Sequence, residues 1–173
     1  MALVAATVGL TGAGCDSFLN RKPPPPCPPV YILKDAGSLT RYKPGAGRDI
    51  IDVLFRGQIV DFKGVCDYNK ERTKVTIELG IAFELLRGPA NRDRKATFGY
   101  IVAIPHFYPA PQGRNIFSLK VQFAERDSRV TAADNVQITI PLDPKKALDE
   151  YGVYLGFQLT RQEVEDNRKV TKY

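Results

Sequence analysis

The stretch Thr73-Lys-Val-Thr-Ile-Glu-Leu-Gly-Ile-Ala-Phe-Glu-Leu85 alternates between apolar residues and polar or small ones along its whole length. Apolar side chains occupy every odd position from Val75 to Leu85, whereas the even positions hold charged, hydroxyl or small residues. A period of two is typical of a β-strand with one face in the core and the other in solvent. The stretch therefore predicts a long antiparallel strand, with a bend near Gly80.

Shorter alternations of the same kind lie on both sides of this stretch. They cover residues 30–33, 39–42, 53–65, 98–104, 117–123, 136–140 and 151–159, separated by turns rich in proline and glycine. Within residues 53–65 the apolar parity switches from odd to even, which predicts a bulge near Gly57. We therefore expect an all-β fold, an antiparallel β-sandwich of about seven to eight strands and of immunoglobulin-like size. Thr160-Arg-Gln-Glu163 fits a capping box and predicts a short C-terminal helix through Arg168.

The N-terminal residues indicate how the chain is attached. Residues 1–14 carry no charge and end in small residues, and a polar, proline-rich stretch follows Cys15 up to Pro29. This order resembles a bacterial lipoprotein precursor, because Ala13, Gly14 and Cys15 match the lipobox. Gly12 departs from it, since an aliphatic residue is usual there. The resemblance implies a signal peptide over 1–14 and an acylated (palmitate-bearing) Cys15; the alternative is an apolar N-terminus with an ordinary free cysteine.

The expected organisation is a signal peptide (1–14), a lipidated cysteine with a proline-rich tether (15–29), a β-sandwich domain (30–160), and a short helix with a charged tail (161–173). The uncharged stretch of residues 1–14 is too short for a transmembrane helix, which needs about 20 residues. If Cys15 carries lipid, Cys27 and Cys66 remain as an even pair in an exported chain. Paired, they close a loop and fasten the tether to an early strand; two buried free thiols are the alternative.

The composition and the motifs argue against several classes of protein. The net charge is +6, but basic residues stand beside acidic ones along the whole chain, which favours solvated loops over a nucleic-acid surface. His106 is the only histidine, and no catalytic motif, metal-ligand spacing or cofactor loop accompanies it. We therefore expect no enzyme activity, no metal, no cofactor and no small-molecule substrate.

Two loops are candidates for binding. Arg48 follows the glycines of Gly45-Ala-Gly47, where either an anion contact or a plain turn is expected. His106, Phe107 and Tyr108 form an aromatic loop that either binds a partner or packs against the sandwich.

Taken together, the layout resembles small alphaproteobacterial envelope lipoproteins of unassigned function. The shared features are Cys15, the Cys27-Pro28 pair, the loop Pro44-Gly-Ala-Gly-Arg-Asp49 and the closing Gly156-Phe-Gln-Leu-Thr160. The resemblance implies a non-enzymatic binding or structural module that is lipid-anchored in the cell envelope and faces the periplasm, with the outer membrane preferred over the inner. The expected partners are the membrane, through the lipid, and an envelope protein. The alternatives are an accessory subunit of a larger membrane assembly and, third, a hydrolase that uses His106.

Overall fold

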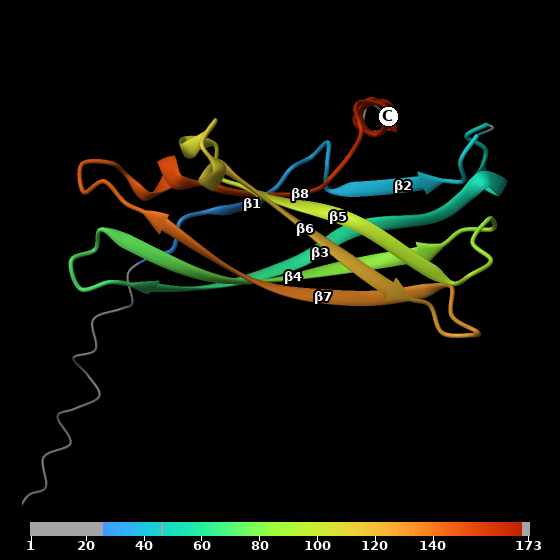
Figure 1. The fold of residues 1–173 in the computed structure, drawn as a ribbon, viewed down its shortest axis with the longest axis horizontal. Helices are drawn as coiled ribbons and strands as arrows, with labels where there is room; N and C mark the ends of the chain where they lie inside the picture. Colours follow the sequence, from blue (N-terminus) through green and yellow to red (C-terminus); the bar gives the residue numbers. More distant parts are fainter. Residues whose placement is uncertain (1–25, 46, 171–173) are drawn as a thin grey trace, which may run out of the picture.

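Eight strands form two packed four-stranded sheets in the computed structural model, which describes residues 26–45 and 47–170 (Figure 1). One sheet has the order β1 (Val30–Ile32), β8 (Val153–Phe157), β5 (Lys95–Ala103), β6 (Arg114–Gln122). The other has the order β2 (Ser38–Tyr42), β3 (Val53–Tyr68), β4 (Lys74–Arg87), β7 (Arg129–Pro141). Neighbouring strands are antiparallel except for β1 and β8, which are parallel. The predicted all-β sandwich is confirmed.

The core forms where the alternating faces of the two sheets meet. The odd residues of β4, from Val75 to Leu85, are at most 1% exposed. Opposite them, β5 contributes Phe98 and Tyr100, and β8 contributes Phe157. The Phe83 ring lies 5.0 to 5.8 Å from these three rings, so one aromatic cluster joins both sheets at their centre.

The bulge in β3 lies three residues beyond its predicted place. The register between β3 and β4 shifts between Ile59 and Asp61, so that Val60 is the extra residue and is exposed. Gly57 is instead paired regularly and faces the core, where an added Cβ would lie 3.1 Å from the Phe157 ring. Its small size thus allows close approach of the two sheets. The ladder between β4 and β7 continues through Gly80 without a shift in register.

The N-terminal segment is fastened to the end of β3. Cys27 and Cys66 form a disulfide with a Cα–Cα distance of 5.7 Å, which confirms the predicted pairing. The Tyr68 hydroxyl donates a hydrogen bond of 2.6 Å to the Pro26 carbonyl. Burial raises the pKa of Tyr68, and the nearby Arg72 charge opposes that rise. Residues 26–29 are therefore held against the sandwich on the side where β3 ends.

The C-terminal helix α1 (Arg161–Val170) begins at the predicted capping box. The Glu163 carboxylate accepts the Thr160 backbone N–H at 2.8 Å, and the Glu163 N–H donates to the Thr160 hydroxyl at 3.3 Å. The helix lies on β2, where the Asn167 amide donates to the carbonyls of Asp35 and Ser38. Residues 171–173 of the predicted tail lie outside the described residues.

Candidate functional site

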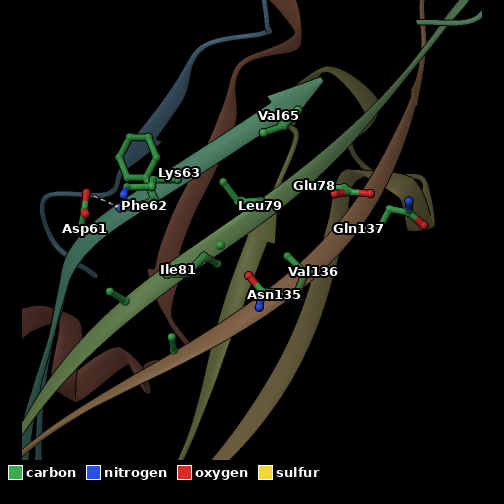
Figure 2. Close-up of a pocket in the computed structure, with 13 residues that line it drawn as sticks. Asp61, Phe62, Lys63, Val65, Glu78, Leu79, Ile81, Asn135, Val136 and Gln137 are labelled. Carbon is green, nitrogen blue, oxygen red and sulfur yellow. Dashed lines mark hydrogen bonds between the residues drawn. The ribbon is translucent and has the colours of Figure 1, made fainter. Parts of the chain in front are cut away.

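A hollow of about 700 Å³ lies on the outer face of the sheet formed by β3, β4 and β7 (Figure 2). The register explains its position, because Lys63, Gly80 and Asn135 stand side by side on the three strands. The rows on either side add the outward residues of the same strands. The lining residues are Asp61, Phe62, Lys63, Val65, Glu78, Leu79, Gly80, Ile81, Ala82, Ala133, Asn135, Val136 and Gln137.

Small residues at the centre of this face produce the hollow. Gly80, Ala82 and Ala133 occupy outward positions where most strands carry longer side chains. Asn135 leans over the glycine, because a Cβ on Gly80 would lie 3.0 Å from the Asn135 side-chain oxygen. The hollow therefore has a floor of small residues, namely Gly80, Ala82 and Ala133, and a rim of polar side chains.

The rim carries polar groups without partners inside the protein. Among the described residues, the side chains of Lys63, Glu78, Asn135 and Gln137 form no hydrogen bond or ion pair. One Asp61 carboxylate oxygen accepts the Phe62 N–H at 2.8 Å. Amides both donate and accept, a lysine donates, and a carboxylate accepts. Such a set can bind a ligand that carries both hydroxyl and amide groups.

The Arg48 loop forms a smaller hollow of about 280 Å³ whose cations are already paired. The Arg48 guanidinium forms an ion pair with Asp166 of α1 and lies over the Tyr42 ring, 5.5 Å from its centroid. Lys43 pairs with Asp52 at 2.6 Å. This bond holds the pKa of Asp52 below its usual value, against the effect of burial. The structure thus places Arg48 in a bridge between the loop and α1.

The aromatic loop divides into packed and exposed residues. The His106 ring lies 4.5 Å from the Tyr151 ring and 5.0 Å from the Phe107 ring, and its Nε2 lies 3.5 Å from Lys146 Nζ. Tyr108, the next residue, is 80% exposed. The structure therefore brings His106 and Phe107 into the body of the protein and leaves Tyr108 free for contacts.

The remaining predicted site residue, Cys15, lies outside the described residues, as does most of the proline run. In the described ranges, no group of three His, Cys, Asp or Glu side chains is arranged to hold a metal ion. No helix in the part of the chain that the structure describes is long and apolar enough to cross a membrane.

Sequence reasoning did not find the hollow. The even positions of the stretch 73–85 were interpreted only as a solvent face, although Gly80 and Ala82 stand out there as small. Their alignment with Ala133 depends on the register between β4 and β7, which a sequence does not specify. In comparisons with known proteins, no family model, curated protein or solved structure matched this chain.

Proposed function

We propose that this protein is a lipid-anchored module of the bacterial cell envelope that binds an envelope polymer through the hollow on β3, β4 and β7. The observation that carries the proposal is a set of polar side chains, without partners among the described residues, around a floor of small residues. All four of these side chains are exposed: Lys63, Glu78, Asn135 and Gln137. The fold does not depend on burying any of them.

The disulfide supports the proposed compartment. Disulfides form and persist in oxidising environments such as the bacterial periplasm, and they are rare in the cytosol. Cys27 and Cys66 are paired, and the segment that contains Cys15 directly precedes this staple. A lipid on Cys15 would hold the end of the sandwich near Tyr68 towards the membrane. The hollow, halfway along β4 and β7, would then face sideways into the periplasm.

The shape and chemistry of the hollow favour a polymer as the ligand. Among the described residues, its lining comes from β3, β4 and β7 alone, so a chain can lie across the face of the sheet and continue beyond either side. Its amides, lysine and carboxylates complement the hydroxyl and amide groups of N-acetylated sugars and peptide cross-links. Peptidoglycan carries both groups and is the probe of choice.

The test is cosedimentation with isolated peptidoglycan sacculi. The variant Ala133→Arg places a long side chain on the floor of the hollow, and Thr131→Arg places the same side chain two residues away on the same face. We expect wild type and Thr131→Arg to sediment with sacculi, and Ala133→Arg to stay in the supernatant with unchanged thermal stability. Equal sedimentation of the two variants, or a wild-type protein that stays in solution, would contradict the proposal.

A further inference from the structure

The free edge of β7 is long and regular, yet a carboxylate blocks its middle. Among the described strands, β7 pairs with β4 alone, and the ladder runs from Arg129 to Pro141 without a bulge. Such an edge is a template for another strand, and proteins protect it with charges, prolines or bulges. Arg129 and Pro141 stand at the two ends of this edge, and between them the protection is one inward-pointing residue, Asp134.

The ladder shows which backbone groups of β7 face this free edge. Arg87 N–H donates to the Ser128 carbonyl, and Leu142 N–H donates to the Thr73 carbonyl. The register is constant between these two bonds. The backbone N–H and C=O groups of the even residues of β7 therefore point towards β4. The odd residues, among them Ala133, Asn135 and Gln137, therefore direct their N–H and C=O groups outward.

Asp134 caps the central one of these outward amides. One of its carboxylate oxygens accepts the Asn135 N–H at 2.9 Å, and the other accepts the Tyr100 hydroxyl at 2.7 Å. Tyr100 is fully buried in the opposite sheet. Burial first, and then the bond to Asp134, raise the pKa of Tyr100 well above its usual value, so the hydroxyl stays protonated and fixes the carboxylate at the edge.

The same arrangement occurs at the other side of this sheet. β2 begins only at Ser38, opposite Gln58 of β3, and the preceding Gly37 carbonyl accepts the Ile59 N–H at 3.0 Å. Beyond the bulge, Phe62 N–H faces this open side, and the Asp61 carboxylate caps it at 2.8 Å (Figure 2). Phe62, Ile81 and Asp134 stand in one row, so the two caps close opposite edges at nearly the same level.

We propose that β7 is a latent pairing surface for a second copy of this chain, and that the Asp134 cap keeps the protein monomeric. In an antiparallel pair of β7 strands centred on Asn135, Thr131 would meet Thr139, and Ala133 would meet Gln137, with no like charges opposite. Between Thr131 and Thr139, the stretch that would pair, Asp134 is the residue that opposes this pairing. Its carboxylate already accepts the central N–H, that of Asn135. In the pair, the Asp134 carboxylates of the two copies would also lie on one face, at diagonal positions about 7–8 Å apart.

Amide hydrogen exchange on the full-length wild-type chain tests the cap itself. We expect Asn135 N–H to exchange about tenfold more slowly than the outward amides of Ala133 and Gln137, because it alone has an acceptor. Equal exchange at the three amides would overturn the proposal, whatever the variants show.

The double variant Tyr100→Phe/Asp134→Val tests the consequence. Both hydrogen-bonding partners are removed together, so that no buried hydroxyl is left without an acceptor. We expect its mass in sedimentation equilibrium to double with rising concentration, with protection of the outward amides of β7. Adding Asn135→Pro, which deletes the central edge N–H, should restore the monomer. Tyr100→Phe alone and Glu78→Gln, which only removes a charge from the same sheet, should stay monomeric. A double variant that stays monomeric, or associates without protection of β7, would refute the proposal.

Discussion

Removal of the Cys27–Cys66 disulfide should lower the free energy of unfolding by about 4 kcal/mol, because the cross-link restricts the unfolded chain. The two cysteines are 39 residues apart. In the chain-entropy model a loop of that length lowers the entropy of the unfolded state by roughly 13 cal/mol/K, or about 4 kcal/mol at 25 °C. Cys27 precedes β1 of one sheet and Cys66 lies in β3 of the other, so the cross-link also ties the two sheets together.

The matching experiment is urea unfolding of the oxidised wild type, the reduced wild type and the variant Cys27→Ser/Cys66→Ala. The m-value should rise when the cross-link is lost, since the open unfolded chain exposes more surface. Reduction and substitution should agree, because both remove the same constraint. A loss below about 1 kcal/mol, or a reduced wild type that differs widely from the variant, would refute the entropic argument.

Three further predictions concern single contacts. The pKa of Tyr100 is raised in the folded state, so its contribution to the free energy of unfolding is complete below pH about 10 and is lost as the pH rises further. The stability of Tyr100→Phe should therefore fall less steeply with rising pH than that of the wild type. Asp52 has a lowered pKa in the folded state, so its contribution to the free energy of unfolding is present above about pH 4 and is lost on acidification. In Lys43→Gln, an NMR titration should show the Asp52 pKa rising towards its ordinary value, and an unchanged pKa would contradict the assigned cause. Asn167→Ala removes two hydrogen bonds, of 3.0 and 2.9 Å, that hold α1 on β2. Its helix amides should exchange about tenfold faster while those of β4 stay unchanged; unchanged helix exchange would show that α1 is held elsewhere.

Periodicity predicted the strands well wherever the inward residues are large and apolar. β4, β5 and β6 follow their alternating patterns to within three residues at each end. β7 is the exception, because the alternation was recognised only over 136–140 whereas the strand begins at Arg129. Its first half places Val130, Ala132 and Asp134 inward. A charged residue at an inward position disrupts the hydrophobic pattern, and here it marks the capped edge.

The candidate site depended on features that a single sequence does not contain. The disulfide was predictable from the count of cysteines. Predicting the hollow requires knowledge of the strand register that aligns Gly80 with Asn135 and Lys63. The bulge at Val60 was misplaced because Gly57 looked like the natural irregular position, whereas close packing against Phe157 explains that glycine.

The most direct test of the lipid-anchored envelope module is the intact mass of the protein isolated from the membranes of cells that make it, before and after reduction. The account predicts loss of residues 1–14, a mass increment for acyl chains on Cys15, and a gain of two hydrogens when Cys27–Cys66 is reduced. A chain that keeps residues 1–14 and carries no lipid would contradict the anchor and, with it, the proposed compartment.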